Sequence, residues 1–365
     1  MLLKRKLYVV VVIAAVLLLM LASQSIQKRH FLSLSLDTPL SWATTTGEDF
    51  RREPAHPAGI PGTHIPPITT RLETQIENSE DDTRPCGCSQ SCVSDLSVSE
   101  WFSRRYDPKQ QPVLHGGENS FDPDALTWWL SLQRTSNDLT LQEVMSEMFK
   151  VIPRPNVDFI PRPSRCRACA VVGNSGNLQQ SEHGKLIDSH ASVIRMNKAV
   201  TRGFEKDVGN RTTHHFLYPE SAVDVERGVS LILLPFKLRD LEWLTSALST
   251  GQVKMTYMRV KDRVEADKDK VLVVNPVFFK YIHDRWTERH GRYPSTGMVA
   301  IIFALHTCDQ VSVFGYGADK QGNWHHYWEE NRYAGAFRKT GVHSADFETQ
   351  VIQQLAKEGK ISLHM

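Results

Sequence analysis

The chain has 365 residues and a formal net charge of +2, with 43 lysines and arginines against 41 aspartates and glutamates. The two signs are interspersed, so no segment forms the basic tract that nucleic-acid binding requires. This balance excludes nucleic acid as the expected partner and leaves sugars as the better candidate.

The first apolar segment is residues 7–22, which follow the basic residues Lys4, Arg5 and Lys6. Positive charge before an apolar segment keeps that end in the cytoplasm, so we expect a single-pass type II membrane protein with a cytoplasmic tail at 1–6 and a signal anchor at 7–22. A cleaved signal peptide is the alternative, because the segment is shorter than the ~20 residues of a typical spanning helix. Membranes of the early secretory pathway are thinner and accept a shorter span, which favours the anchor.

Residues 23–85 are rich in proline, threonine, serine and charged residues and show no sustained apolar period. This composition is typical of a flexible stem. The remaining residues, 86–365, suffice for one large domain or two small ones, and the regular alternation of elements along them favours one.

Six cysteines lie beyond the apolar segment, at Cys86, Cys88, Cys92, Cys166, Cys169 and Cys308. An even number in a compartment that permits oxidation predicts disulfides. A zinc knuckle and a thioredoxin-type dithiol are weaker alternatives, because no Cys or His pair completes a repeated metal spacing and the Cys-x-x-Cys motif does not open a helix after a strand. Spacing alone leaves the connectivity undecided.

Large apolar residues mark helical pieces around 101–102 and 128–132, followed by a helix at 141–149. Short β-rich runs then alternate with helical ones. The expected strands are 170–172, 192–196, 215–218, 229–234, 271–274 and 311–314, and the expected helices are 241–248, 277–289, 297–306 and 344–357. Apolar strands separated by helices favour an α/β fold with a mostly parallel sheet covered on both faces.

Small polar residues follow several of these strands. Residues 173–177 (Gly-Asn-Ser-Gly-Asn) follow the first strand, Asn197 follows the second, 315–317 follow the last, and 295–297 (Ser-Thr-Gly) open a helix. Taken singly, each is also an ordinary turn or helix cap. Together, at the carboxyl edge of a parallel sheet and at a helix N-terminus, they predict a nucleotide-phosphate site. The G-x-G-x-x-G spacing of dinucleotide enzymes is missing, so a dehydrogenase is not expected.

Four ordered blocks resemble those of the animal sialyltransferases, especially the β-galactoside α-2,3-sialyltransferases that act on Gal-β1,3-GalNAc. The blocks run from Cys166 through Gly-Asn-Ser-Gly to His215, from His290-Gly-Arg-Tyr-Pro-Ser-Thr-Gly to Asp319, over His325-His-Tyr-Trp-Glu, and from His343 to Glu348. The resemblance extends from residue 86 to the C-terminus. It implies a Rossmann-like α/β/α sandwich, a GT-A-type variant, forming a lumenal catalytic domain at 86–365 of a Golgi membrane enzyme.

The same resemblance implies the disulfides Cys169–Cys308, Cys88–Cys166 and Cys86–Cys92. It also implies CMP-sialic acid as the donor and catalysis without a metal or other cofactor. CMP-sialic acid has one phosphate, which leaves less charge to neutralise than a diphosphate. Two Asp-x-Asp strings occur, but Asp122-Pro-Asp124 is typical of a helix start and Asp267-Lys-Asp269 of a loop before a strand, so neither is placed as a metal-ligand pair.

Residue roles follow from the resemblance together with chemistry. His343 matches the catalytic base, since histidine has the pKa nearest the working pH, and Glu348 is expected to support it. His326 matches the residue that stabilises the departing phosphate. The implied donor-binding residues are Asn174, Ser175, Asn197, Ser295, Thr296, Gly297, Gly317 and His326, and the implied acceptor-binding residues are Gln133, Tyr257, Tyr293 and Trp324.

Other histidines have ordinary expectations. We expect His183, His283, His306 and His364 to be core or surface residues, and the adjacent His325 and His326 to be a poor metal site because neighbouring side chains diverge. Asn210, in Asn-Arg-Thr, is the expected N-glycosylation site.

The function so implied is inverting transfer of sialic acid from CMP-sialic acid to the 3-hydroxyl of terminal galactose in Gal-β1,3-GalNAc of glycoproteins or glycolipids. The alternatives are a sialyltransferase of α-2,6 or α-2,8 linkage and a catalytically silent CMP- or glycan-binding protein. The sequence leaves open the choice between O-glycan and ganglioside acceptors, and it is compatible with a homodimer without requiring one.

Overall fold

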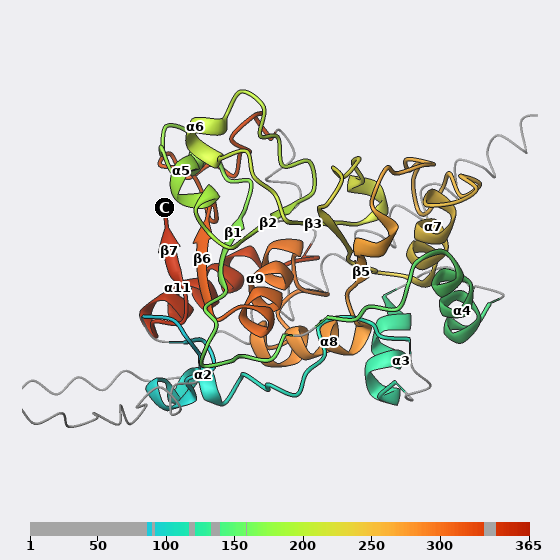
Figure 1. Cartoon of the computed structure of the whole chain (residues 1–365), viewed down its shortest axis with the longest axis horizontal. Helices are drawn as coiled ribbons and strands as arrows, with labels where there is room; N and C mark the ends of the chain where they lie inside the picture. Colours follow the sequence, from blue (N-terminus) through green and yellow to red (C-terminus); the bar gives the residue numbers. More distant parts are fainter. Residues whose placement is uncertain (1–85, 90–91, 117–120, 133–138, 158, 332–340) are drawn as a thin grey trace, which may run out of the picture. The chain divides into compact units, whose positions relative to one another are not determined.

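The computed structural model describes residues 86–89, 92–116, 121–132, 139–157, 159–331 and 341–365 (Figure 1). The expected tail, anchor and stem, residues 1–6, 7–22 and 23–85, lie outside the described residues. In the part of the chain that is described, no helix is both long enough and apolar enough to span a bilayer.

The centre of the fold is one seven-stranded sheet in which every pair of neighbours is parallel. Its strands are β1 (Ala168–Val172), β2 (Ser192–Met196), β3 (His214–Leu217), β4 (Ser230–Leu233), β5 (Val271–Val273), β6 (Gln310–Phe314) and β7 (Ser362–His364), in the order β5-β4-β3-β2-β1-β6-β7. The predicted parallel sheet and its six expected strands are confirmed. The seventh, Ser-Leu-His, was missed because three residues of mixed polarity give no β pattern.

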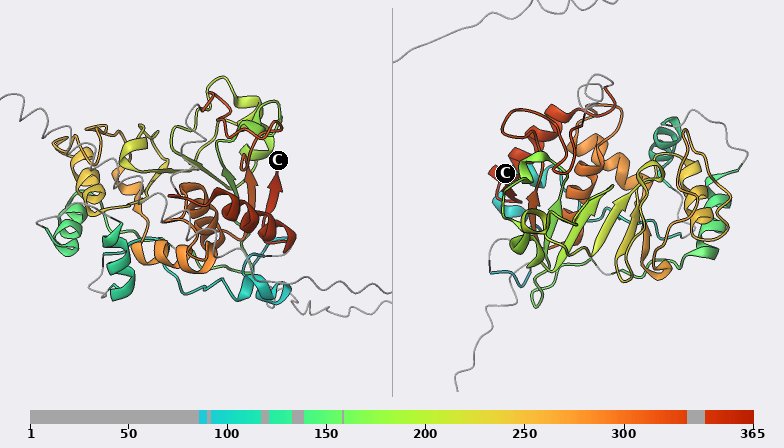
Figure 2. Two further views of the ribbon diagram at one scale, coloured as in Figure 1. Left: turned by 180° about the vertical axis from the view of Figure 1, so that it is seen from behind. Right: turned by 90° about the horizontal axis from the view of Figure 1, so that it is seen from above.

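The strands are apolar because both faces of the sheet are buried. In β1, Cys169 and Val171 belong to one hydrophobic core, whereas Ala170 and Val172 belong to another. Side chains of a strand alternate between its faces, so these two cores are the two sides of an α/β/α sandwich. The helices that cover them are seen in Figures 1 and 2.

The larger core includes residues from most of the helices. The described helices and turns are η2 (Leu96–Val98), α2 (Glu100–Ser103), α3 (Pro123–Ser131), α4 (Leu141–Val151), η3 (Gly176–Leu178), α5 (Gly184–Asp188), α6 (Glu205–Val208), η4 (Pro219–Ser221), α7 (Leu238–Ala247), η5 (Lys268–Lys270), α8 (Pro276–Tyr281), η6 (Ile282–Trp286), α9 (Thr296–Thr307) and α11 (Ala345–Lys357). Helix α9 is buried at every residue except Gly297 and packs on β1, β2 and β3. The smaller core takes Ile187 of α5 and Val208 of α6.

Two predicted helices differ at their ends. The helix expected at 277–289 is α8 followed by a single π-type turn, η6, and it stops because Glu288 and Arg289 have positive φ angles of 46° and 63°. Helix α7 begins three residues earlier than expected. The buried Asp240 carboxylate accepts hydrogen bonds from the backbone N–H groups of Phe236 and Lys237 and so fixes that start.

Three disulfides join Cys86 to Cys92, Cys88 to Cys166 and Cys169 to Cys308, the same pairs that the family resemblance implies. The last links β1 to the residue that caps the C-terminus of α9, just before β6. It therefore holds together the two strands whose carboxyl ends form the site described below.

Loop length predicts unequal contributions from these bonds. Closing a loop restricts the unfolded chain more when the loop is longer. With sequence separations of 139 and 6 residues, the Cys169→Ala/Cys308→Ala variant is expected to lose about 5 kcal/mol of unfolding free energy and the Cys86→Ala/Cys92→Ala variant about 2 kcal/mol. Urea unfolding under non-reducing conditions measures both. Equal losses would show that chain entropy does not govern their stabilisation.

Candidate functional site

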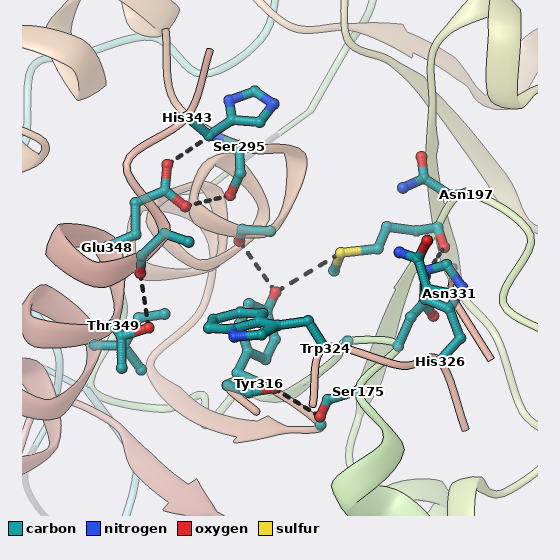
Figure 3. A pocket seen from close by; sticks show the side chains of 18 of the residues that line it. Ser175, Asn197, Ser295, Tyr316, Trp324, His326, Asn331, His343, Glu348 and Thr349 are labelled. Atoms are coloured by element: carbon teal, nitrogen blue, oxygen red, sulfur yellow. Dashed lines mark hydrogen bonds between the residues drawn. The ribbon is translucent and has the colours of Figure 1, made fainter. Parts of the chain in front are cut away.

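A pocket of about 340 Å³ lies at the carboxyl ends of the central strands (Figure 3). Residues from the turns after β1, β2 and β6 line it, together with the start of α9, the segment 324–331 and the start of α11. β1 lies between β2 and β6, so the strand order reverses there. Parallel α/β sheets bind their ligands in the crevice at such a reversal.

The turns after β1 and β6 approach each other closely. A Cβ atom on Gly173 would lie 2.3 Å from the carbonyl oxygen of Gly315, so only glycine fits at 173. The Ser175 N–H donates to that same carbonyl at 3.0 Å, and the Ser175 hydroxyl donates to the carbonyl of Gly317 at 2.8 Å. The two turns therefore form one rigid wall of the pocket.

The turn after β2 adds a strained asparagine. Asn197 has φ of +58°, a left-handed conformation that asparagine tolerates better than most residues. His215 of β3, largely buried, lies 2.6 Å through its Nε2 from the Asn197 carbonyl, to which it donates, and burial lowers the pKa of this histidine. The side-chain oxygens of Asn197 and Asn174 are buried without a hydrogen-bond partner among the described residues, which leaves two polar groups in the pocket able to bind a ligand.

Glu348 of α11 occupies the N-terminus of α9. Its carboxylate accepts from the Ser295 N–H at 2.8 Å and from the Ser295 hydroxyl at 2.5 Å, while that hydroxyl accepts from the Met298 N–H. A helix N-terminus favours negative charge, and here the protein supplies the anion itself. Burial raises the pKa of Glu348 to about 7 although the bonds from Ser295 lower it.

His343 is held in a defined tautomer. Its Nδ1 lies 2.9 Å from the Tyr293 carbonyl oxygen, and because a carbonyl only accepts, Nδ1 carries the proton. In the neutral ring the lone pair is then on Nε2. Burial lowers the pKa of His343, so the imidazole is neutral over a wider pH range than an exposed histidine. This is the state required of a general base.

His326 is fixed on the opposite side of the pocket (Figure 3). Its ring stacks on Trp328 with centroids 4.6 Å apart, and its Nδ1 is 3.0 Å from a carboxylate oxygen of Glu329. A bridge between Ser175 and His326 anchors the segment to the turn after β1. The contact with Glu329 and the stacking on Trp328 fix the orientation of the His326 ring in the pocket.

The structure brings most of the predicted site residues into one pocket. Those that line it are Asn174, Ser175, Asn197, Ser295, Gly297, Gly317, Trp324, His326, His343 and Glu348. Thr296, at the start of α9, is buried and does not line the pocket, and the ring of Tyr293 lies 5.0 Å from that of His343. Tyr257 is 72% exposed and does not line the pocket. Gln133 lies outside the described residues.

Several lining residues were not predicted, among them Met196, Tyr316, His325, Asn331 and Thr349. Tyr316 donates its hydroxyl to the Gly297 carbonyl at 3.0 Å and so joins the turn after β6 to α9. Burial raises its pKa well above the usual range. The signal in the sequence was its position between Gly315 and Gly317, because a large side chain in a strand-end turn of glycines packs against the residues around that turn.

The remaining candidates have structural places. Asp122 caps α3 by accepting from two backbone N–H groups, and Asp267 precedes the short turn η5. Within the described ranges no three His, Cys, Asp or Glu side chains converge as metal ligands. His283 stacks on Trp128, His306 bonds within α9, and His183 and His364 pack on Phe314. Asn210 is exposed, and its backbone N–H donates to Asp188.

A parallel sheet with a pocket at its strand reversal, a helix N-terminus and a half-buried histidine of defined tautomer define a nucleotide-binding α/β enzyme. Residues 114–360 match glycosyltransferase family 29 (sialyltransferase), and the chain belongs to this family.

Named relatives agree with the family. The chain is 55% identical over 281 residues to mouse CMP-N-acetylneuraminate-beta-galactosamide-alpha-2,3-sialyltransferase 2, covering 77% of this chain and 80% of the relative. It is 50% identical over 282 residues to human CMP-N-acetylneuraminate-beta-galactosamide-alpha-2,3-sialyltransferase 1, covering 77% and 82%. The crystal structure of a mammalian sialyltransferase in complex with Gal-beta-1-3GalNAc-ortho-nitrophenol superposes with a TM-score of 0.70 at 47% identity, over 77% of this chain and 99% of that one.

The buried Glu348 predicts a pH-dependent stability. A carboxyl whose pKa rises on folding, here from 4.5 to about 7, contributes stability that is complete below pH 4.5 and is lost as the pH rises through about 7. Relative to wild type, Glu348→Gln is therefore expected to be more stable at pH 8 than at pH 5.

Urea unfolding of both proteins at the two pH values measures the difference. The other titrating groups are common to both proteins and cancel. A difference in unfolding free energy that does not change with pH contradicts the shift.

Proposed function

We propose that the protein transfers sialic acid from CMP-sialic acid to the 3-hydroxyl of galactose in Gal-β1,3-GalNAc, forming an α-2,3 linkage. The observation that carries the proposal is His343, a half-buried histidine whose Nδ1–H donates to the Tyr293 carbonyl, in the same pocket as the strand-end asparagines. The names of the relatives and the acceptor in the related crystal structure support the choice of substrates.

The donor is assigned to the wall made by the strand ends. Asn174, Ser175, Asn197 and the backbone around Gly317 offer small polar groups to the nucleotide and its phosphate. His326 faces them and would stabilise the negative charge that develops on the phosphate as CMP departs. Neutral donors and one histidine are a sufficient set for a single phosphate, so we propose that the reaction needs no metal.

His343 is assigned as the base. As the acceptor 3-oxygen attacks the anomeric carbon of sialic acid, the bond from that carbon to the CMP phosphate breaks and Nε2 takes the hydroxyl proton. Attack opposite the departing CMP inverts the configuration and turns the β-linked donor into an α-linked product. Tyr293, packed edge-on against His343, lies where the acceptor would meet the base, and Trp324 lines the same pocket.

The cellular setting belongs to the proposal as well. The basic residues before the apolar segment 7–22 support a single-pass type II protein of the Golgi membrane with the catalytic domain in the lumen. CMP-sialic acid and Gal-β1,3-GalNAc glycans on glycoproteins or glycolipids are the proposed partners.

The first test is transfer by the full chain in detergent. With CMP-sialic acid and EDTA present, an α-2,3-linked product is expected on Gal-β1,3-GalNAc, with much less product on Gal-β1,4-GlcNAc. The linkage is determined by linkage-specific sialidases. An α-2,6 or α-2,8 product would replace the assigned linkage, and CMP binding without any transfer would indicate a binding protein.

The second test concerns the base. Replacing His343 with alanine is expected to lower kcat by about 10² to 10⁴ while CMP still binds with wild-type affinity. In the wild type, kcat/KM falls on the acid side as His343 protonates, at a pH below 6.5, because burial lowers its pKa. A His343→Ala variant that keeps both the rate and this acid limb would remove His343 from the mechanism.

A further inference from the structure

We propose that Lys237 is a positioning residue for the acceptor: two buried carboxylates hold its ammonium group, which orients the ring of Tyr257. The proposal rests on the proposed function and on the family resemblance, which implies that Tyr257, outside the pocket itself, binds the acceptor. Lys237 itself belongs to none of the four sequence blocks and does not line the pocket.

The ammonium group is fixed by charge on two sides. Lys237 Nζ lies 2.6 Å from Asp240 Oδ1 and 3.1 Å from Glu220 Oε1. The side chains of Asp240, Glu220 and Lys237 are 0%, 5% and 13% exposed. Such an arrangement is costly to desolvate, and burial raises the pKa of Asp240 to about 6 despite the nearby lysine. Ion pairs at a protein surface form without burying their charged groups, so the burial of these three side chains is not explained by ion pairing alone.

The same two carboxylates also bind the segments on either side of Lys237, which are the start of α7 and the loop that carries Tyr257. Asp240 Oδ2 accepts from the backbone N–H groups of Phe236 at 2.9 Å and Lys237 at 3.2 Å, which fixes the start of α7. Glu220, just after β3, accepts a hydrogen bond from the Thr256 hydroxyl, the residue before Tyr257. The lysine therefore lies between two anchored backbones.

Tyr257 receives the ammonium group on its ring. Lys237 Nζ is 4.9 Å from the ring centroid, within the range of a cation–π interaction. Its short loop is closed by bonds from the Thr256 N–H to the Met258 carbonyl and from the Val260 N–H to the Lys254 carbonyl. Because Tyr257 is 72% exposed, packing restrains its ring weakly, and the contact with Lys237 sets its orientation.

The start of α7 also reaches the base. Phe236, next to Lys237, packs on Tyr293 with centroids 4.9 Å apart, and Tyr293 packs on His343 at 5.0 Å. The dipeptide Phe236-Lys237 thus contacts both Tyr293, which lies beside the base, and the exposed Tyr257. Lys237 sets the position of Tyr257 relative to Tyr293. Recognition of a disaccharide requires two such contact residues at a fixed separation.

The test is a double-mutant cycle on the full chain, with Gal-β1,3-GalNAc-ortho-nitrophenol as acceptor. Lys237→Met, which keeps the length of the side chain, is expected to raise the acceptor KM roughly three- to tenfold, the effect of one cation–π contact, with the KM for CMP-sialic acid unchanged. Tyr257→Leu is expected to do the same. The double variant should be no worse than Tyr257→Leu alone, because both changes remove one interaction.

Matched controls separate positioning from general damage. Lys237→Arg keeps the charge and Tyr257→Phe keeps the ring, so each should raise the acceptor KM less than Lys237→Met and Tyr257→Leu, respectively. Lys261→Met removes a nearby exposed lysine paired with Asp224 and should have no effect. If Lys237→Met is too unstable to assay, the variant Lys237→Met/Glu220→Gln takes its place in the cycle. This variant removes one positive and one negative charge and so leaves no additional unpaired charge buried.

Three outcomes overturn the proposal. Additive effects in the cycle, or an equal loss of donor and acceptor affinity, would make Lys237 a structural residue only. An unchanged acceptor KM in Tyr257→Leu would show that the ring it orients does not contact the acceptor, although the proposed function would stand. If the wild-type chain transfers no sialic acid at all, the proposed function fails first and the role of Lys237 falls with it.

Discussion

The pocket depends on the close approach of the turns that follow β1 and β6. A side chain at Gly173 would collide with the Gly315 carbonyl, and one at Gly315 would meet Leu178 at 2.4 Å. With no side chain at either position, Ser175 of the first turn donates hydrogen bonds across the gap to the carbonyls of Gly315 and Gly317, both in the turn after β6. The segment that carries His326 then attaches to this wall, through the Gly176 N–H to the His325 carbonyl and the Tyr327 N–H to the Asn174 carbonyl. The donor side of the site is thus a consequence of two glycines.

The C-terminal part of the chain forms the other half of the pocket, and the carboxylate of Glu348 joins its elements. Glu348 bonds to Ser295 at the start of α9, and Tyr293, two residues earlier, accepts from His343. The base and the helix N-terminus therefore share their supports. With a pKa of about 7, Glu348 is protonated in a substantial fraction of molecules near neutral pH. This reduces the negative charge that an anionic donor would meet on entering the site.

The sequence predicted the fold correctly where strands are buried on both faces. Segments such as 170–172 and 231–234 are apolar throughout because both of their faces are covered, and that pattern predicts a parallel sheet. The start of α7 and the end of α8 did not follow, because the first depends on side-chain hydrogen bonds of Asp240 to the N–H groups of Phe236 and Lys237 and the second on two residues with positive φ, none of which hydrophobic periodicity reveals. Short elements such as α5 and β7 carried no periodic signal.

The site could be predicted in its composition and not in its geometry. Turn residues such as Asn174 and Asn197 are recognisable as strand ends, and histidine chemistry together with the family blocks selects His343. That the N-terminus of α9 already binds Glu348, or that Lys237 lies under the ring of Tyr257, depends on contacts between residues far apart in the chain. Periodicity and spacing do not contain this information.

The strand order has a consequence for how the chain acquires its structure during synthesis. Strands β1 to β5 are synthesised in the order in which they pair on one side of β1. The other edge of β1 pairs with β6, whose residues come 142 positions later in the chain, as in the pairs Ala168–Gln310 and Val172–Phe314. Until then β1, four of whose five residues are buried in the finished fold, has an unpaired edge, the kind of surface that associates with other chains. Contacts so distant in sequence also form slowly. The last-made fifth of the chain therefore both completes the pocket and closes the edge of the sheet, so a nascent chain without it would be prone to aggregation as well as inactive.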